Sequence, residues 1–193
     1  MKNFLSFFIS LFVFLSTFSQ VRLEPSVNIN GLDYYLYDDI NEAMVADGNS
    51  WEGYLELPSK VTYEGKEYTV TKIDWKAFCS CHTMTGISIP ETIRKIDFLL
   101  PQQGQPFDGC DHLESITVKD GNQWFSSEEG VLYDKEKTKL ICYPAASKRK
   151  IFTVPYGVKS IGEGAFGYCQ NLTAVSFPNT INDMDRCAFH NCI

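Results

Sequence analysis

The chain has 193 residues, 44% of them hydrophobic and 21% charged, a balance typical of a globular protein that excludes disorder over most of its length. Its formal net charge at pH 7 is −7, and its densest basic run is only Lys148-Arg149-Lys150. Because proteins that bind nucleic acids need clustered lysines and arginines, this charge pattern excludes a nucleic-acid partner.

Residues 1–19 predict export. Lys2 precedes an apolar run from Phe4 to Phe18, which is shorter than the roughly 20 helical residues needed to cross a bilayer. Small residues at Thr17 and Ser19 complete the pattern of a secretory signal peptide, and we expect cleavage after Ser19. An uncleaved membrane anchor is the alternative interpretation. No later stretch is apolar for long enough to span a membrane, so we expect a secreted or cell-surface protein.

Residues 20–56 are predicted to form a β-rich N-terminal cap. Tyrosines and tryptophans stand there among turn signals such as Asp47-Gly48-Asn49, without the repeat that follows. A solenoid needs an atypical end piece to cover its first open edge. The run from Val61 to Val70 then predicts a hairpin that leads into the first full repeat unit.

Residues 57–193 carry a recurring motif in which an apolar residue and three variable residues precede Ala-Phe-x-x-Cys. Clear copies, whose last two phenylalanines lie about 23 residues apart, are Ile73–Cys81, Ile161–Cys169 and Met184–Cys192. An interrupted copy ends at Phe107–Cys110. After the cysteine comes an apolar residue, two variable ones and an alternating apolar pair, as in Met84–Ile89, Leu113–Val118 and Leu172–Phe177. A further apolar pair, such as Ile93 and Ile96, completes the unit.

Each part of this unit predicts a local structure. Alternation at Ile87 and Ile89 predicts a short strand with one buried face, which Pro90 ends. Ala-Phe-x-x-Cys is expected to form a tight turn or a single helical turn that fills the interior with phenylalanine. Because one unit cannot bury its apolar side alone, the copies should stack. The predicted interior column consists of Phe78, Phe107, Phe166 and Phe189 with Cys81, Cys110, Cys169 and Cys192.

The repeat resembles the BspA-like subclass of leucine-rich repeats, found in surface and secreted proteins of host-associated bacteria and some protists. The resemblance covers residues 57–193. It implies a leucine-rich-repeat solenoid, mostly β with short helical or 3-10 turns, wound as a right-handed superhelix. It also implies binding to surface partners, often in adhesion.

Two features depart from a regular repeat. The wide gap between Phe107 and Phe166 requires an inserted element at about residues 119–150, in which two apolar runs between Gly130 and Pro144 flank a charged turn and predict a hairpin. The sequence also stops one residue after Cys192, where the next strand would begin, which suggests a truncated product or an uncapped C-terminus. As a hypothesis, the protein self-associates through this end, because an uncovered strand edge favours association.

The cysteines are expected to be structural. Residues in the same slot of adjacent turns would stack about 4.8 Å apart, whereas a disulfide needs Cβ atoms about 3.8 Å apart. We therefore favour a reduced, buried column over same-slot disulfides. Cys79, Cys142 and Cys187 lie off the register and could pair.

No catalytic or cofactor chemistry is expected, so the sequence predicts a protein that is not an enzyme. Gly162–Gly167 fits G-x-G-x-x-G, but the strand–helix context of a dinucleotide or kinase loop is missing. Cys79-Ser-Cys81-His82 lacks the second close pair typical of structural zinc, so no metal is expected. No nucleophile motif with its context is present.

The predicted function is therefore non-catalytic binding of a protein or glycan on a cell surface or matrix. One candidate surface is a flat, polar strand face, comprising Ser88, Ser115, Thr117 and Ser176. Alternative aromatic anchors in the insertion are Trp124, Phe125 and Tyr133, which could equally form the hairpin core. A structural, self-assembling repeat protein or a fragment of a larger surface protein is the second hypothesis.

Overall fold

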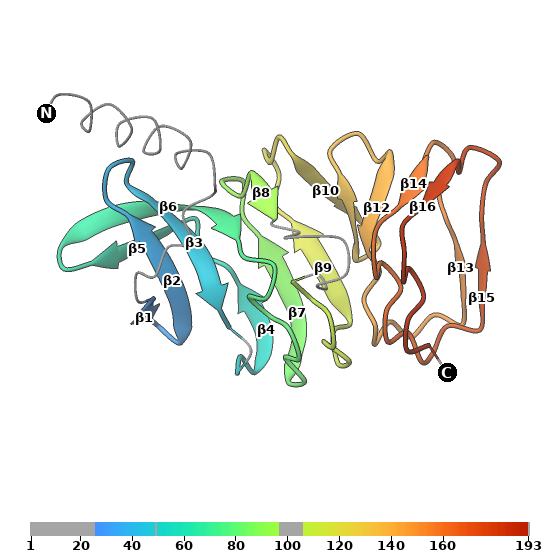
Figure 1. The fold of residues 1–193 in the computed structure, drawn as a ribbon, viewed down its shortest axis with the longest axis horizontal. Helices are drawn as coiled ribbons and strands as arrows, with labels where there is room; N and C mark the ends of the chain where they lie inside the picture. Colours follow the sequence, from blue (N-terminus) through green and yellow to red (C-terminus); the bar gives the residue numbers. More distant parts are fainter. Residues whose placement is uncertain (1–25, 49, 97–105, 193) are drawn as a thin grey trace, which may run out of the picture.

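The computed structural model describes residues 26–48, 50–96 and 106–192, which form a β-solenoid of about five turns (Figure 1). The predicted signal peptide lies outside the described residues. Strands stack along the long axis of the molecule from blue to red, as the repeat predicts. Within the described ranges the Ala-Phe-x-x-Cys segments are hydrogen-bonded turns and no helix of any type occurs, so the expected helical or 3-10 turns are not found there.

The N-terminal part is a six-stranded sheet. Five of its strands follow the order β1-β2-β3-β6-β5, and the sixth, β8, also pairs with β6. Its strands are β1 (Val27–Ile29), β2 (Leu32–Tyr37), β3 (Glu42–Asp47), β5 (Lys60–Tyr63), β6 (Lys66–Ile73) and β8 (Lys95–Ile96). The hairpin predicted over residues 61–70 is confirmed as the antiparallel pair β5–β6. It turns through Glu64 and Gly65, both with positive φ, as a two-residue hairpin turn requires.

The repeat strands form a parallel three-stranded sheet of β4 (Gly53–Glu56), β7 (Met84–Ile89) and β9 (Ser115–Val118). Ile87 pairs with Ile116 in the register that the sequence repeat implies, and both side chains are completely buried. The strand β4 lies inside the range predicted as the cap, yet it pairs in parallel with β7. Repeat-like pairing therefore begins before residue 57.

The insertion joins a second, five-stranded sheet in the order β10-β11-β12-β14-β16. Its strands are β10 (Phe125–Glu128), β11 (Val131–Asp134), β12 (Lys139–Cys142), β14 (Ser160–Ile161) and β16 (Asp183–Met184). The predicted insertion hairpin is confirmed as the antiparallel pair β11–β12. A separate parallel pair, β13 (Ile151–Thr153) with β15 (Ala174–Ser176), supplies the repeat strands of the last turns.

The phenylalanines of the repeat stack as predicted at two steps of the solenoid. The rings of Phe78 and Phe107 lie 5.7 Å apart with an interplanar angle of 1°, and those of Phe166 and Phe189 lie 4.7 Å apart at 2°. Between these pairs stands Tyr143 from the insertion, 5.3 Å from Phe166. The buried residues accordingly form two core clusters, one around Phe78 and one around Phe166.

Backbone hydrogen bonds tie neighbouring turns together at the phenylalanine slot. The N–H of Phe166 donates to the carbonyl of Ala188 at 2.8 Å, and the N–H of Tyr143 donates to the carbonyl of Ala165 at 2.7 Å. Tyr143 therefore takes the place of a repeat phenylalanine although its local sequence lacks the motif. Such bonds satisfy the backbone of turns that form no helix.

Gly48 occupies the same slot in the first turn, because its N–H donates to the carbonyl of Ala77 at 2.6 Å. A Cβ atom at Gly48 would lie 2.6 Å from Phe78 Cε1 and 2.7 Å from Leu32 Cδ2. A side chain there has no room. At this end of the solenoid the first ring of the column is therefore covered by the N-terminal sheet.

Candidate functional site

Four of the cysteines lie in the solenoid interior, and none of these four forms a disulfide. Cys81, Cys110, Cys142 and Cys169 are buried. Burial raises the pKa of the Cys142 thiol to about 12, and burial with the neighbouring Cys81 and Cys142 raises the pKa of Cys110 still further. Because the thiolate is the reactive form, Cys110 and Cys142 are poor nucleophiles.

Repeat thiols bridge neighbouring turns through hydrogen bonds. The Cys110 thiol donates to the carbonyl of Phe78 at 3.0 Å, and the Cys192 thiol donates to the carbonyl of Phe166 at 2.9 Å. Cys192, unlike the other three repeat cysteines, is exposed. Three members of the predicted column are thus buried, whereas its last member lies at the surface.

No disulfide joins the off-register cysteines Cys79, Cys142 and Cys187 to one another. Cys79 is half-buried, and burial followed by the charge of Asp108 raises its pKa to about 11. Cys142 lies close enough to Cys110 and Cys169 to raise the pKa of each. The insertion thus supplies a sulfur to the column as well as the ring of Tyr143.

The described residues contain no group of three or more His, Cys, Asp or Glu side chains that could hold a metal ion. The glycine motif at residues 162–167 lies in a turn of the repeat between β14 and β15. Its surroundings are strands and turns rather than a strand followed by a helix. The motif therefore lacks the geometry with which such loops hold a nucleotide.

The strands β7 and β9, which carry most of the predicted polar face, pair as expected, but other side chains cover part of that face. Ser88 pairs with Thr117 in register, yet Ser88 is only 4% exposed. The Tyr54 hydroxyl lies 2.9 Å from Thr117 Oγ1, and its ring covers Gly86, where a Cβ atom would lie 2.6 Å from Tyr54 Cδ2. The polar ladder of this sheet is thus partly covered by an aromatic side chain from the preceding turn.

The ion pair between Glu56 and Lys119, with Nζ and Oε1 2.5 Å apart, joins the two outer strands across β7. Glu56 pairs in register with Ser88, so this bridge passes beside the Ser88 hydroxyl. Sequence reasoning missed both crossing contacts because they join residues 63 positions apart.

The other two residues of the predicted face lie apart from one another. Ser115 is half-buried against the insertion, where a Cβ atom at Gly130 would lie 3.2 Å from Ser115 Cβ. Ser176 is exposed on β15, in a different sheet. The insertion explains the break, because the N–H of Ile116 donates to Gly130 O at 2.9 Å, so the insertion contacts β9.

The three candidate aromatic anchors differ sharply in exposure. Tyr133 is 1% exposed, and burial raises the pKa of its hydroxyl, so it belongs to the core. Phe125 is partly buried against the N-terminal core cluster. Trp124 is 45% exposed and is the member of the three that a partner can reach.

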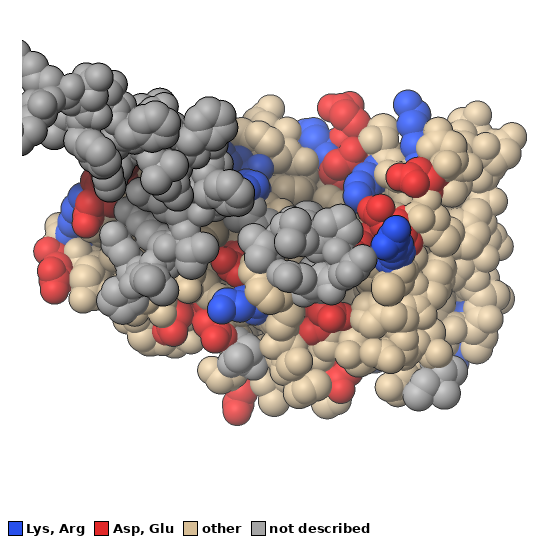
Figure 2. All heavy atoms as spheres, viewed as in Figure 1, with Lys and Arg blue, Asp and Glu red and all other residues tan. Residues whose placement is uncertain are grey.

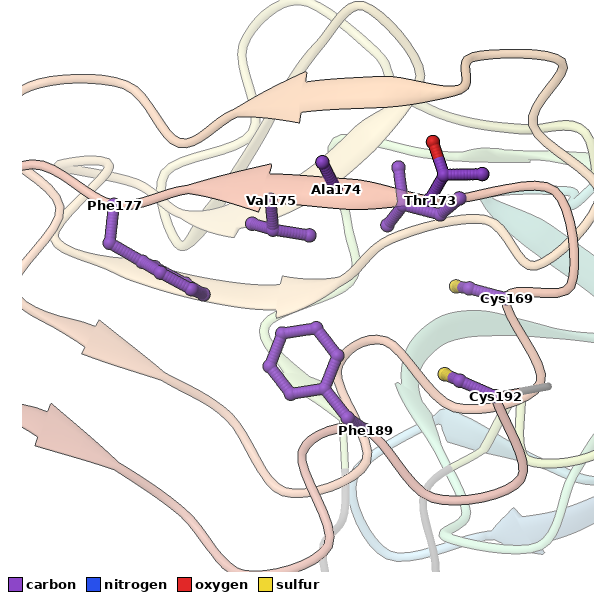
Figure 3. A pocket seen from close by; sticks show the side chains of 8 residues that line it. Cys169, Thr173, Ala174, Val175, Phe177, Phe189 and Cys192 are labelled. Carbon is purple, nitrogen blue, oxygen red and sulfur yellow. The ribbon is translucent and has the colours of Figure 1, made fainter.

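An apolar groove, absent from the sequence-based candidates, lies at the end of the last described turn (Figure 3). Its volume is about 280 Å³, and it is lined by Cys169, Leu172, Thr173, Ala174, Val175, Phe177, Phe189 and Cys192. The rings of Phe177 and Phe189 meet edge to face, with centroids 6.2 Å apart, and are 40% and 37% exposed. On the face shown in Figure 2, acidic and basic side chains are interspersed over the middle of the molecule, whereas this end is mostly uncharged.

Within the described ranges, no helix has the length and apolar character of a membrane span.

Solved structures and one family of repeat proteins are similar to this chain. No curated protein matches the chain. Similar crystal structures include a leucine-rich repeat protein from Eubacterium ventriosum (16% identity, TM-score 0.48, 83% of this chain and 61% of that one) and a leucine rich cell surface protein from Faecalibacterium prausnitzii (19%, 0.47, 83% and 45%). A leucine-rich repeat protein from Bacteroides ovatus is 24% identical with a TM-score of 0.48, over 81% of this chain and 42% of that one. The chain thus spans less than two thirds of these proteins.

A family described as BspA type leucine rich repeat region (6 copies) matches residues 141–193. This range holds the two clearest copies of the Ala-Phe-x-x-Cys turn, those ending at Cys169 and Cys192. Leucine-rich-repeat domains generally mediate protein interactions and are typically non-catalytic. Residues 141–193 of the chain thus match the BspA-type leucine-rich-repeat family.

Proposed function

We propose that the protein is exported and acts as a non-catalytic binding module for a protein or glycan on a cell surface or matrix, with Trp124 as its anchor. The observation that carries the proposal is the exposure of Trp124 on a rigid backbone. Trp124 is 45% exposed, while its backbone N–H donates to Asn122 Oδ1 at 2.8 Å and its backbone carbonyl accepts from the Lys135 N–H at 2.9 Å.

A fixed, exposed aromatic side chain suits recognition for two reasons. Tryptophan supplies a large apolar area with few rotatable bonds, so little conformational entropy is lost on binding. Hydrogen bonds on both sides of Trp124 hold its backbone in place before a partner arrives. The predicted signal peptide supports an extracellular setting for this surface.

The test is a binding screen of the mature chain against extracellular-matrix proteins and glycans, followed by titration of the captured ligand. Trp124→Ala is expected to weaken binding at least about tenfold, because loss of an anchor side chain costs about 2 kcal/mol or more. The matched control is Tyr156→Ala, which removes an 82% exposed aromatic ring from the turn after β13. Absence of any captured ligand, or equal weakening by both variants, contradicts the proposal.

Self-assembly is the second candidate, favoured by the apolar groove at the last described turn. The partner would be a second copy of the chain, because the groove is uncharged and carries the exposed rings of Phe177 and Phe189. At the opposite end Leu32 and Gly48 cover Phe78, so two copies would meet groove to groove. Such an arrangement uses the same patch on both copies and closes as a dimer instead of growing into a fibre.

Light scattering over a concentration series separates this candidate from the first. We expect a monomer–dimer equilibrium that Phe177→Asp abolishes, because a carboxylate in the groove would lose its hydration on association. Ile40→Asp, which alters a side chain 51% exposed in the N-terminal sheet, should leave the equilibrium unchanged. A clean monomer at high concentration, or species larger than a dimer, would argue against it.

A further inference from the structure

The side chain of Tyr54 lies across the sheet formed by β4, β7 and β9. It starts on β4, and its hydroxyl lies 2.9 Å from Thr117 Oγ1 on β9, two strands away (Figure 1). The strand between them is β7, and the Tyr54 ring passes over Gly86 of that strand. Tyr54 is nevertheless 52% exposed. An aromatic ring is thus held against this sheet in a fixed position while much of its surface faces solvent.

A glycine in β7 makes this position of the ring possible. A Cβ atom at Gly86 would lie 2.6 Å from Tyr54 Cδ2 and 2.9 Å from Tyr54 Cε2, well inside the distance at which unbonded carbon atoms repel. Gly86 pairs in register with Tyr54 on one side and with Ser115 on the other, so both neighbouring strands carry a side chain at this level. Ser88, the next residue of β7 on the same face, is also small and is 4% exposed. The small residues of β7 therefore leave the space that the ring occupies.

Polar side chains with spare hydrogen-bonding capacity border the ring. Glu56 follows Tyr54 by two residues on β4 and therefore lies on the same face, and it forms an ion pair with Lys119, which follows Thr117 by two residues. The side chains of Glu56 and Lys119 are 69% and 48% exposed. A carboxylate has several lone pairs and an ammonium group has several N–H groups, so both can bind a ligand while they stay paired. Acceptors, donors and the Thr117 hydroxyl thus surround one aromatic surface.

The rest of this sheet face is polar. Among the described residues, no large hydrophobic side chain of β7 or β9 is exposed. The centre of a protein interface buries a cluster of apolar side chains, which this face does not offer. A pyranose ring instead presents a small face of C–H groups with hydroxyl groups around it. The C–H groups are attracted by the negative face of an aromatic ring, and the hydroxyl groups can donate to a carboxylate and accept from an ammonium group. The chemistry of this face therefore fits a sugar ring better than a protein.

We propose that Tyr54 is a stacking platform for a sugar ring whose hydroxyl groups are bound by Glu56, Thr117 and Lys119. The ligand is a pyranose of the glucose type, because its ring substituents are equatorial and leave C–H groups on both faces of the ring. The contact with Thr117 holds the Tyr54 ring in place before the sugar arrives, so little conformational entropy is lost on binding. The inference goes beyond the role proposed for Trp124, since it names a ligand class and uses other residues.

Titration of the nitrogen-15-labelled mature chain with cellopentaose, a soluble oligomer of β-linked glucose, tests the proposal by NMR. We expect saturable shifts of the backbone amides of Gly86, Ser88 and Thr117, while those of the hairpin β5–β6 stay constant. Tyr54→Ala should weaken binding at least about fivefold, the effect expected for the loss of one aromatic contact. The matched control is Tyr156→Ala, which removes an 82% exposed ring from the turn after β13 and should bind as the natural chain does.

Gly86→Ala separates the position of the ring from its presence. The variant keeps Tyr54, but the added methyl group pushes the ring off β7, so binding should weaken as much as in Tyr54→Ala. The ring belongs to an exposed side chain that can turn away, so the variant should fold, which circular dichroism checks. The Trp124 test uses another substitution and a captured matrix ligand, so either proposal can fail without the other. The platform is refuted if cellopentaose causes no saturable shifts, if Tyr54→Ala or Gly86→Ala binds as the natural chain does, or if Tyr156→Ala weakens binding equally.

Discussion

Replacing Phe166 by alanine is expected to lower the free energy of unfolding by about 3–5 kcal/mol, the range found for large-to-small substitutions in tightly packed cores. Phe166 is completely buried, and its ring packs 4.7 Å from Phe189, 5.3 Å from Tyr143 and 6.1 Å from Phe152. Because each turn of a solenoid contacts only its neighbours, the cavity would weaken the turns on both sides. Urea unfolding followed by circular dichroism measures the change.

The matched control is Phe189→Ala, which removes the same side chain from the same repeat slot one turn later. Phe189 is 37% exposed and has a ring partner on its inner side, Phe166, so its removal should cost clearly less than that of Phe166. Equal losses at the two positions would show that the column is not a stack with a buried centre and an exposed end.

Replacing Asn122 by alanine is expected to cost about 2–4 kcal/mol, an unusually large effect for a polar side chain. Asn122 is 1% exposed, and its side chain makes four hydrogen bonds. Its Nδ2 donates to the carbonyls of Pro90 and Ile93, both at 2.9 Å, and its Oδ1 accepts from the N–H groups of Trp124 and Phe125, both at 2.8 Å. Alanine would remove all four of these hydrogen bonds from a buried position.

Asn122→Asp separates the two halves of this network. The carboxylate can still accept from Trp124 and Phe125, but at neutral pH it has no hydrogen to donate to the Pro90 and Ile93 carbonyls. We expect a loss at least as large as that of alanine, reduced when acid protonates the carboxyl group. Gln123→Ala, at the exposed neighbouring position, is the control and should change stability by no more than about 0.5 kcal/mol. A similar small change at Asn122 would contradict the role given to it.

The sequence predicted the repeat and its register because periodic burial of side chains requires a periodic pattern of apolar residues. Ile87 and Ile116 are buried side by side as the pattern requires, and the hairpins of β5–β6 and β11–β12 form where turn residues separate two apolar runs. These features depend on contacts between neighbouring residues or between equivalent positions of adjacent units. Both kinds of contact leave a pattern that can be recognised in a single sequence.

The candidate site was predicted less well, because exposure depends on residues far away in the chain. Ser88 was assigned to an open strand face from its alternation, but the Glu56–Lys119 bridge and the Tyr54 ring come from other turns. The sequence did not indicate which of Tyr133 and Trp124 would be buried and which exposed. Only the pairing of the insertion with the solenoid buried Tyr133 and left Trp124 at the surface.

The sequence by itself determined the repeating unit, its family resemblance and the positions that fill the interior. It did so because each unit repeats the same spacing of apolar residues and the same turn. What only the tertiary structure decided was which non-repeat residues enter those slots and which side chains reach across turns. Gly48 and Tyr143 occupy the phenylalanine slot without the motif, and His190 reaches Asp108 over Gly167. Such placements follow from how the turns stack, since a steric gap or a free hydrogen-bonding group exists only once distant segments lie together.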